Sequence, residues 1–238
     1  GETPELTLLL NGTTARGADI SQFYSQKWKH VGTTIFSAYN YNGAYDPSGS
    51  GFSAIPQNRR FTLNPKVFFY PNARTKGWLG INTTFENRFG GDMQVLRGNG
   101  DALHQYFERN RTSRYSTQFS LTRQISENSE INLKNTVGYF DRDLSGPGSL
   151  FSAKQLSPYS ELNYVYKGLK TDWVSGANIW TDRLTARETY SNLNYDQKTF
   201  GLFTQNTWKA TDRFSLESGL RLDYNSPAGI NTLHGFMI

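Results

Sequence analysis

Residues 214–224 read Phe-Ser-Leu-Glu-Ser-Gly-Leu-Arg-Leu-Asp-Tyr, and the alternation within this stretch decides the fold class. Leu220 and Leu222 alternate with Arg221 and Asp223, so an extended chain is apolar on one face and charged on the other. A period of two is the pattern of a β-strand with one apolar face, and the helical period of 3.6 residues does not fit it. The same alternation returns in residues 79–86, 115–122 and 131–139.

This periodicity predicts an all-β protein with eleven strands. Many of the predicted strands exceed ten residues, whereas strands of soluble sandwiches usually have about five or six. A tilted strand that crosses a membrane needs about nine to eleven residues. The lengths therefore favour an antiparallel, up-and-down transmembrane β-barrel. The predicted strands are residues 4–13, 17–27, 31–42, 57–70, 76–88, 112–125, 130–142, 157–168, 170–183, 196–209 and 212–225.

The connections between these strands support a barrel, because short and long ones alternate from the third strand onward. In an up-and-down barrel, successive connections lie at opposite rims, so all the short turns are expected at one rim. Short periplasmic turns and long extracellular loops are typical of outer-membrane barrels. The short turns are Asn72–Thr75, Glu127–Ser129, Gly168–Leu169 and Ala210–Asp212, and the long connections are Gly43–Pro56, Phe89–Arg111, Asp143–Leu156 and Leu184–Tyr195.

The composition of the 238 residues fits this architecture. Hydrophobic residues make up 36% of the chain and aromatic residues 15%, and the mean hydropathy is −0.63. A barrel wall alternates lipid-facing and lumen-facing residues, so its mean hydropathy resembles that of a soluble protein. No segment approaches the 18 consecutive apolar residues of a membrane helix. The sequence therefore excludes helical membrane spans but not a barrel.

Aromatic residues near the strand ends are consistent with the girdles that flank the apolar band of a barrel. The alternative is that these rings pack in a soluble β core. The residues expected in the girdles are Trp28, Trp78 and Trp208 near the short turns, and Tyr39, Tyr41, Tyr139 and Trp180 near the long loops.

Eleven is an odd strand count, whereas bacterial single-chain barrels usually close with an even number. Residues Asn225–Asn231 read as a loop, and Thr232–Ile238 reads as the beginning of another strand. Eleven strands are half of a 22-stranded barrel, the size of plugged outer-membrane transporters. We therefore expect residues 1–238 to form part of a larger barrel wall.

The segment Phe200–Tyr224 resembles a β-hairpin of TonB-dependent outer-membrane receptors, in which a Gln- and Trp-containing strand turns and re-enters as Leu-x-x-Gly-Leu-Arg-x-Asp-Tyr. Four further motifs are similar to receptors of this family from Bacteroidetes-type bacteria. They are Tyr45-Asp-Pro, Gly51-Phe-Ser-Ala-Ile-Pro56, Asn64-Pro-Lys-Val-Phe-Phe69 and Phe85-Glu-Asn-Arg-Phe-Gly-Gly-Asp-Met93.

The resemblance covers nearly the whole chain, as the first half of the barrel wall. It implies a receptor of the bacterial outer membrane that binds a siderophore, cobalamin, glycan or peptide and imports it through a plugged barrel with TonB-coupled energy. Its implied partners are membrane lipid, a plug domain, TonB, and a surface lipoprotein or larger outer-membrane complex. We expect residues 1–238 to be one partial barrel domain, with the plug domain and the remaining strands outside it.

No catalytic constellation is evident, so we expect a protein that is not an enzyme and has no cofactor. The histidines His30, His104 and His234 lie in separate segments without the spacing of a metal site. No Gly-x-Ser-x-Gly elbow occurs. The absence of Cys excludes thiol nucleophiles and zinc fingers. The net charge is +5, but the basic residues are scattered among acids, so nucleic acid is not an expected partner.

Two groups of polar residues are candidates for function. Charges on the polar face of the strands must project into the lumen, because a charge on the lipid side is costly. We expect them to contact the plug or to pair across strands, ahead of touching substrate directly. The 89–111 connection is the candidate for ligand capture, because long loops on a rigid scaffold commonly bind ligands, although it could simply pack over the barrel mouth. The lumen candidates are Glu86, Arg88, Glu217, Arg221 and Asp223, and the loop candidates are Arg97, Asp101, His104, Tyr106, Phe107 and Arg109.

Two other functions remain open at this stage. A passive porin or a structural, secretion-associated barrel would have the same wall, and a soluble β-rich binding module would share the alternation. A plug domain in the parent gene would separate a receptor from a porin, and a need for detergent would separate either barrel from a soluble module.

Overall fold

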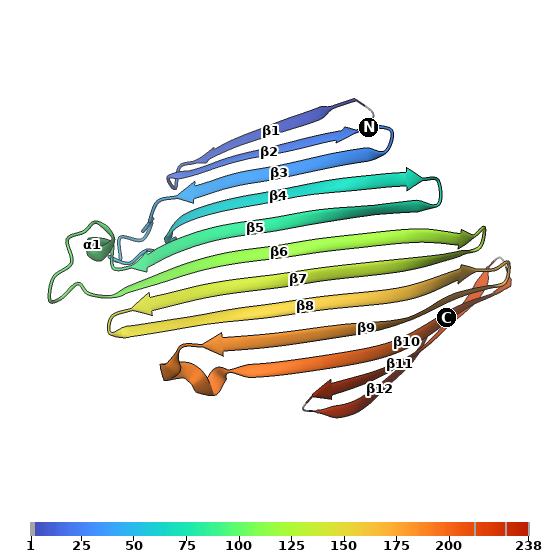
Figure 1. The fold of residues 1–238 in the computed structure, drawn as a ribbon. Helices are drawn as coiled ribbons and strands as arrows, with labels where there is room; N and C mark the ends of the chain where they lie inside the picture. Colours follow the sequence, from blue (N-terminus) through green and yellow to red (C-terminus); the bar gives the residue numbers. More distant parts are fainter. Residues whose placement is uncertain (1–2, 212, 227, 238) are drawn as a thin grey trace.

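A computed structural model describes residues 3–211, 213–226 and 228–237. The described residues form one antiparallel sheet of twelve strands, in which each strand pairs with its neighbours in the chain (Figure 1). The strands are β1 (Glu5–Thr13), β2 (Gly17–Lys27), β3 (Val31–Asn42), β4 (Gln57–Asn72), β5 (Thr75–Gly91), β6 (Phe107–Ser126), β7 (Ser129–Gly146), β8 (Ser149–Lys167), β9 (Thr171–Ala186), β10 (Tyr195–Thr211), β11 (Phe214–Ser226) and β12 (Gly229–Met237). The prediction of an all-β, up-and-down architecture is confirmed.

A twelfth strand, β12, follows the eleven predicted ones; its beginning was predicted at Thr232, and it starts at Gly229. The segment Asn225–Asn231, predicted as a loop, instead contributes the end of β11 and the start of β12. Its Asn, Ser and Pro residues resemble a loop composition, yet Asn225 pairs with Gly229 and the ladder continues from there. Ile238, the last residue of the predicted strand Thr232–Ile238, lies outside the described residues.

The predicted short turns lie at one rim and the long loops at the other, but the rim of the long loops also carries the short connections 14–16 and 147–148 (Figure 1). The short turns at residues 28–30, 73–74, 127–128 and 168–170 lie at one rim, which we call the short-turn rim, together with the connection between β10 and β11. Asp212 in that connection lies outside the described residues. The connections 43–56, 92–106 and 187–194 lie at the opposite rim, which we call the long-loop rim. The first of these is the predicted loop Gly43–Pro56, and the other two are shorter than predicted.

The predicted long connection Asp143–Leu156 is wrong, because β7 and β8 meet in a hairpin at Pro147 and Gly148. Gly148 has φ +69°. Proline at the first central position and glycine with positive φ at the second are the residues that a type II turn requires. The Gly-Pro-Gly cluster does mark the turn, but the ladder extends to Gly146 and Ser149 on either side of it. The polar residues that flank the turn are therefore strand residues.

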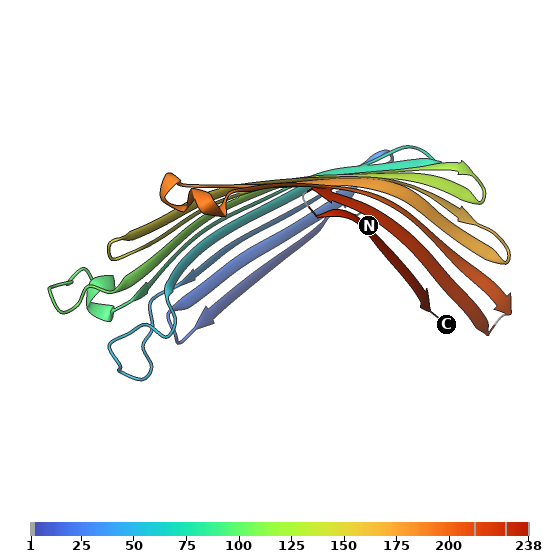
Figure 2. The ribbon, with the colours of Figure 1, turned by 90° about the horizontal axis from the view of Figure 1, so that it is seen from below.

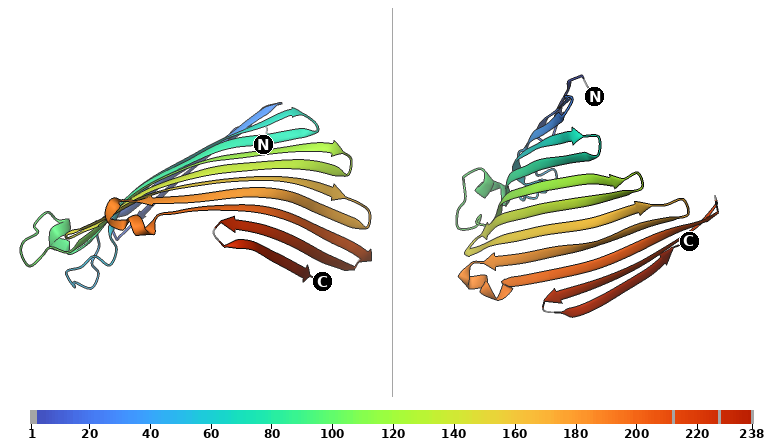
Figure 3. Two further views of the ribbon diagram at one scale, coloured as in Figure 1. Left: turned by 60° about the horizontal axis from the view of Figure 1, so that its bottom comes forward. Right: turned by 45° about the vertical axis from the view of Figure 1, so that its right-hand side comes forward.

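The sheet is a curved single layer with two free edges. Figure 2 shows it as an arch, with the strands at both edges curving down from the middle strands, and Figure 3 shows the curved sheet from two further sides. In the described residues, β1 and β12 are the two edge strands and do not pair with each other. The only buried apolar residues there are Ala38, Ala153 and Ala186. The sheet therefore has no closed hydrophobic core of its own.

Helices are minor in the described part of the chain. A single turn, α1 (Met93–Leu96), lies in the 92–106 connection, and a 3-10 helix, η1 (Glu188–Leu193), lies in the 187–194 connection. None of the helices in these residues is long and apolar enough to span a bilayer.

The strand register assigns every side chain to one of two faces, because directly opposed residues of antiparallel neighbours project to the same side. One row across nine strands defines the outer face: Leu222, Leu202, Ala177, Leu162, Leu133, Leu121, Gly77, Phe69 and Val31. The next row defines the inner face: Asp223, Gly201, Asn178, Glu161, Lys134, Ser120, Trp78, Phe68 and Gly32. The two faces thus differ as the alternation in the sequence predicts.

Burial on these faces is the reverse of that in a soluble protein. Leu220 and Ile81 on the outer face are 47% and 49% exposed, whereas Asn178 on the inner face is only 5% exposed. A soluble sheet buries its apolar face against a second layer. An apolar face left open over a whole curved sheet instead suits contact with lipid. The apolar residues of the alternating stretches in β5, β7 and β11 lie on the outer face: Leu79, Ile81, Ile131, Leu133, Leu216, Leu220 and Leu222.

The two aromatic girdles need one correction, because Trp78 and Trp180 lie on the inner face. Trp78 belongs to the inner row, and Trp180 has the same parity as Asn178 on β9. Trp180 donates a hydrogen bond from Nε1 to Ser157 Oγ at 2.9 Å. Closeness to a strand end was the only guide to these two residues, and parity decides the face. Trp208, Tyr39, Tyr41 and Tyr139 do lie on the outer face.

Candidate functional site

The charges predicted to face the lumen all lie on the inner face. Lys134 and Asp223 belong to the inner row, and the remaining ones share its parity on their own strands. The predicted residues are Glu86, Arg88, Glu217, Arg221 and Asp223, and Lys134 lies on the same face. The inner face is therefore polar and charged over β5, β7 and β11.

Several of these charges pair across neighbouring strands, which was one of the predicted roles. Lys134 Nζ lies 3.0 Å from Glu161 Oε1, and Arg60 Nε donates to Glu86 Oε2 at 2.5 Å. Glu161 also accepts hydrogen bonds from Tyr159 at 2.6 Å and Asn163 at 2.9 Å. The inner face over β7 and β8 is thus a connected polar network rather than a row of separate charges.

A second cluster occupies the inner face of β9 to β11. Arg221 Nε donates to Asp223 Oδ2 at 2.7 Å, and its guanidinium also contacts the amide of Asn178. Gly201 lies directly beneath this cluster: a Cβ there would come within 2.7 Å of the Arg221 guanidinium and of Asn178 Oδ1. The cluster therefore depends on the missing side chain at position 201.

An arginine-rich hollow lies on the inner face of β4 to β7, close to the long-loop rim. Its volume is about 490 Å³, within the range of about 300–1,000 Å³ that is usual for small-molecule sites. Of its charged residues, only Glu86 is acidic, and it is engaged by Arg60. We call this the arginine hollow. It is lined by Arg60, Arg88, Arg114, Arg142, Glu86, Phe140, and by Thr and Asn side chains.

The arginines of the hollow are held in different ways. Arg114 lies 4.6 Å from the centre of the Phe140 ring, and Arg142 Nε donates to Asn110 Oδ1 at 3.2 Å. Arg88 is exposed, and no carboxylate of the described residues lies within 4.0 Å of it. Three of the four guanidiniums therefore have no carboxylate partner, and the hollow carries a net positive charge.

Two loops at the long-loop rim brace each other beside the strands that form the hollow. The 43–56 loop joins β3 to β4, and the 92–106 loop joins β5 to β6. Met93 N donates to Gly51 O at 2.8 Å, and Ser53 N donates to Gly91 O at 2.9 Å. The rings of Phe52 and Tyr106 lie 6.2 Å apart. The two loops are consequently one unit.

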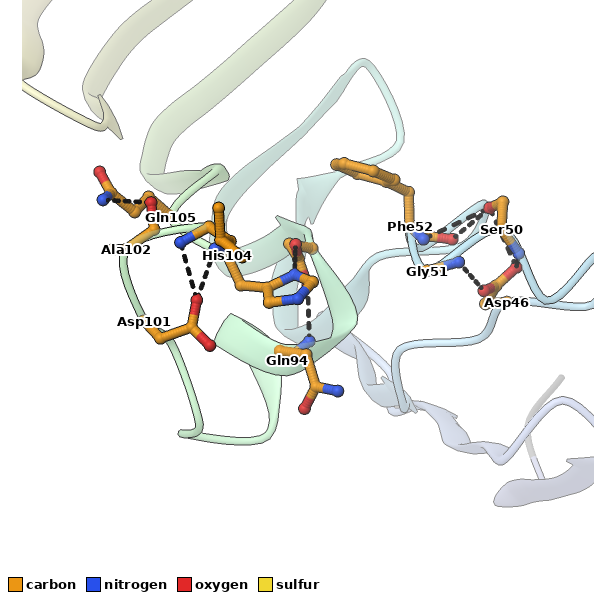
Figure 4. Close-up of polar contacts among 11 residues, drawn as sticks. Asp46, Ser50, Gly51, Phe52, Gln94, Asp101, Ala102, His104 and Gln105 are labelled. Atoms are coloured by element: carbon orange, nitrogen blue, oxygen red, sulfur yellow. Dashed lines mark hydrogen bonds and ion pairs between the residues drawn. The ribbon is translucent and has the colours of Figure 1, made fainter.

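Asp46 fixes the bend of the 43–56 loop. Its carboxylate accepts hydrogen bonds from Gly51 N at 2.8 Å and Ser50 N at 3.2 Å (Figure 4). Desolvation opposes the charged form, but these hydrogen bonds outweigh it and lower the pKa of Asp46. The Asp46 carboxylate is therefore engaged by the backbone of its own loop.

Asp92 ties the two ends of the 92–106 loop together. One carboxylate oxygen accepts from Gln94 N at 2.8 Å and caps α1, and the other lies 2.6 Å from His104 Nδ1. Asp92 is 5% exposed. The hydrogen bond with His104 is the main cause that lowers the pKa of Asp92, and it also raises the pKa of His104. The sequence analysis did not single out Asp92, because it adjoins two glycines and a short helix that the strand pattern does not predict.

The predicted loop residues divide into two groups in the structure. Asp101 accepts from the backbone N of Leu103 and His104, so with His104 it shapes the loop (Figure 4). Arg97 and Tyr106 are exposed in the same loop. Phe107 and Arg109 were predicted in the loop, but they lie in β6 and project to the outer face. The placement of both residues in the loop is therefore wrong, because β5 and β6 extend to Gly91 and Phe107.

The arginine hollow could have been found by extending the alternation. Arg114 has the parity of the polar residues Ser116 and Gln118 on β6, and Arg60 has the parity of Thr62 on β4. Their convergence required the register between strands, which one sequence does not give. In the described residues, no group of three or more His, Cys, Asp or Glu side chains could hold a metal ion.

Comparison with known proteins gives a clear result for the fold. No protein-family model matches the chain, and no curated protein matches it. Among solved structures, the copper transporter OprC matches 98% of this chain with a TM-score of 0.76 at 13% identity. The ferric yersiniabactin uptake receptor FyuA from Yersinia pestis matches 99% with a TM-score of 0.73 at 12% identity. The siderophore receptor PirA from Acinetobacter baumannii matches 98% with a TM-score of 0.71 at 13% identity.

These proteins are TonB-dependent receptors, and the chain matches part of their barrel. The fold is that of a TonB-dependent receptor barrel. Proteins with this fold lie in the bacterial outer membrane, and the exposed apolar outer face fits that location. The chain covers 42%, 42% and 40% of OprC, FyuA and this PirA, respectively.

Proposed function

We propose that this chain is part of the wall of an outer-membrane active-transport receptor that imports its substrate with TonB-coupled energy. The substrate classes expected from the sequence are a siderophore, cobalamin, a glycan or a peptide. The structural neighbours include siderophore and copper receptors, and that likeness supports the transport function.

The observation that carries the proposal is the position of the arginine hollow beside the braced loops. The hollow lies on β4 to β7, and the 43–56 and 92–106 loops rise from β3 to β6 at the same rim. A ligand that enters past the loops meets Arg88 first, then the row of Arg60 and Arg142, and then Arg114. Guanidinium groups form charge-assisted hydrogen bonds with carboxylates and phosphates. We infer a substrate with anionic groups.

A plug domain and TonB are the partners that this function needs. The inner-face charges Glu217, Arg221 and Asp223 lie far along the sheet from the hollow, on β11 (Figure 1). Arg221 and Asp223 already pair with each other, and Glu217 is hydrogen-bonded by Gln205. A surface whose charges are already hydrogen-bonded within the wall suits contact with a protein domain better than capture of a charged ligand. We infer that this region contacts the plug. A surface lipoprotein or larger complex remains a further candidate partner.

The free edges of the sheet support a larger barrel. Every residue of β1 is exposed, and Leu6, Leu8 and Leu10 are 63–70% exposed. A long unpaired apolar edge is a liability that a closed barrel removes. We propose that further strands pair with β1 and β12 and close a wall of about 22 strands, the size of plugged transporters.

Uptake by whole cells tests the proposed function. Cells with and without the gene would be given labelled ferric enterobactin, cobalamin, an acidic oligosaccharide and an acidic peptide, each with and without a protonophore. We expect one anionic probe to accumulate only with the gene and only with an intact proton gradient. The variant Arg88→Gln with Arg114→Gln should weaken that uptake about ten-fold or more, because each arginine loses a charge-assisted hydrogen bond.

The matched control is Arg123→Gln, which removes a positive charge from the outer face near the short-turn rim. It should leave uptake unchanged. Uptake that persists with the protonophore would indicate a passive porin and overturn the proposal. Equal uptake by the double variant would overturn the assignment of the hollow while leaving energised transport intact.

A further inference from the structure

The outer face changes character abruptly at the long-loop ends of β4 to β6. Its apolar band includes Phe61 on β4 and Phe85 on β5, which pair directly with each other. The next outer row contains Arg59, Asn87 and Arg111, and the row beyond it contains Gln57, Phe89 and Arg109. Three arginines therefore occupy the first two polar rows above the band.

Two of these arginines line a small hollow that opens on the outer face. The hollow has a volume of about 190 Å³, and all its lining residues have outer-face parity. We call it the outer niche. It is lined by Gln57, Arg59, Asn87, Phe89 and Arg109.

The arginine side chains are placed by aromatic rings. The Arg109 guanidinium lies 4.2 Å from the centre of the Phe89 ring, and that of Arg59 lies 6.0 Å from the centre of the Tyr41 ring. Arg109 Nε is buried and has no hydrogen-bond partner among the described residues. A buried donor without an acceptor costs free energy, and a ligand in the niche could supply the missing acceptor.

Neighbouring cations on the same face and rim are neutralised, which sets the niche apart. Arg183 Nη2 lies 2.5 Å from Asp196 Oδ2, and Lys154 Nζ lies 4.0 Å from Asp141 Oδ2. By contrast, no described carboxylate lies within 4.0 Å of Arg59, Arg109 or Arg111. Even Asp143, which is opposite Arg111 in the register, makes no ion pair with it. The niche is therefore the part of this rim that lacks a counter-charge.

We propose that the outer niche binds the phosphate group of a lipid headgroup in the outer leaflet. Arginine matches phosphate with parallel hydrogen bonds, and Arg59 and Arg109 converge on one hollow. Phosphates lie just beyond the hydrocarbon region, which is the level of the first polar rows. A free phosphate has the same chemistry, but the niche borders Phe61 and Phe85, where acyl chains can pack. The proposal rests on the outer-membrane fold and not on the proposed transport.

Native mass spectrometry of the purified protein in detergent tests this proposal. The probes are bis-phosphorylated lipid A, the same lipid without its phosphates, and inorganic phosphate. We expect lipid A to bind, and the other two to bind at least ten-fold more weakly. The variant Arg59→Gln with Arg109→Gln should weaken lipid A binding by more than ten-fold, since each basic residue near a membrane surface contributes about five-fold.

The matched control is Arg183→Gln, which removes a cation from the same face and rim, but one already paired with Asp196. Its binding of lipid A should stay within two-fold of the unmodified protein. Equal binding of phosphorylated and dephosphorylated lipid by the unmodified protein would overturn the proposal without needing any variant. Inorganic phosphate that binds as tightly as lipid A would overturn the lipid as the source.

Discussion

The outer and inner faces of the sheet are built from the same strands, yet their relation to burial is inverted. On the outer face, Leu222 is 41% exposed, whereas Asn163 on the inner face is 7% exposed. The inner side of a curved sheet crowds its side chains, and the outer side spreads them apart. The exposed fraction of a side chain therefore depends on the curvature of the sheet, whereas its polarity depends on the medium that its face contacts. Hydrophobic residues on the open side are informative only because they cover the whole face.

The largest expected effect comes from replacing an apolar outer-face residue of β11 by a charged one. Leu220→Arg puts a charge on the outer face, at a cost of about 2–4 kcal/mol near the bilayer midplane. It also loses the transfer free energy of a leucine, about 1.5–3 kcal/mol when fully buried. We expect folded protein to be nearly absent from the outer-membrane fraction. Heat-modifiability on gels and protease resistance of that fraction measure this outcome.

Arg221→Leu is the matched control, one residue away on the inner face. It removes a guanidinium that bonds Asp223 and Asn178, so it weakens the inner cluster without placing a charge in lipid. We expect much of this variant to assemble. Equal loss of both variants would show that the two faces of β11 do not meet different media.

A smaller effect is expected from adding a side chain at a glycine on the inner face. Gly201→Leu should destabilise the barrel by about 1–3 kcal/mol, because the new side chain must displace Arg221 and Asn178. Gly219→Leu is the matched control on the same face of the next strand, where the nearest atom to a new Cβ is 3.9 Å away. Urea unfolding in detergent compares the two variants. Similar midpoints would contradict the crowding of the inner face.

The faces and the rims could be predicted from the sequence because both depend on local information. Parity along one strand separates Leu220 from Arg221, and turn composition separates the Gly168–Leu169 turn from the 43–56 loop. The sequence failed where a strand continues beyond the membrane with polar residues. There Asp143 and Arg109 look like loop residues, although their backbones are paired with a neighbouring strand.

The candidate site was less predictable, because it depends on register and on contacts distant in the chain. The residues of the arginine hollow come from four strands, and no spacing in one strand brings Arg60 near Arg142. His104 and Asp101 were predicted correctly as loop residues. Their partners were not predicted: Asp92 is twelve residues from His104 and has no pattern that marks it as an anchor.

The smallest expected effect concerns the Asp92–His104 contact at the long-loop rim, where polar groups are exposed to water rather than crowded as on the inner face. The hydrogen bond from Asp92 raises the pKa of His104 above its ordinary value of 6.5 and lowers that of Asp92 below 3.8. The contribution of His104 is complete below pH 6.5 and is lost as the pH rises through its higher folded pKa. The contribution of Asp92 is complete above pH 3.8 and is lost as the pH falls through its lower folded pKa. The 92–106 loop should thus be held most firmly between these two pH values.

Histidine NMR titration of the protein in detergent should give a pKa above 6.5 for His104, and Asp92→Asn should return it toward 6.5. A His104 pKa that is the same with and without Asp92 would show that the loop is not held by this pair.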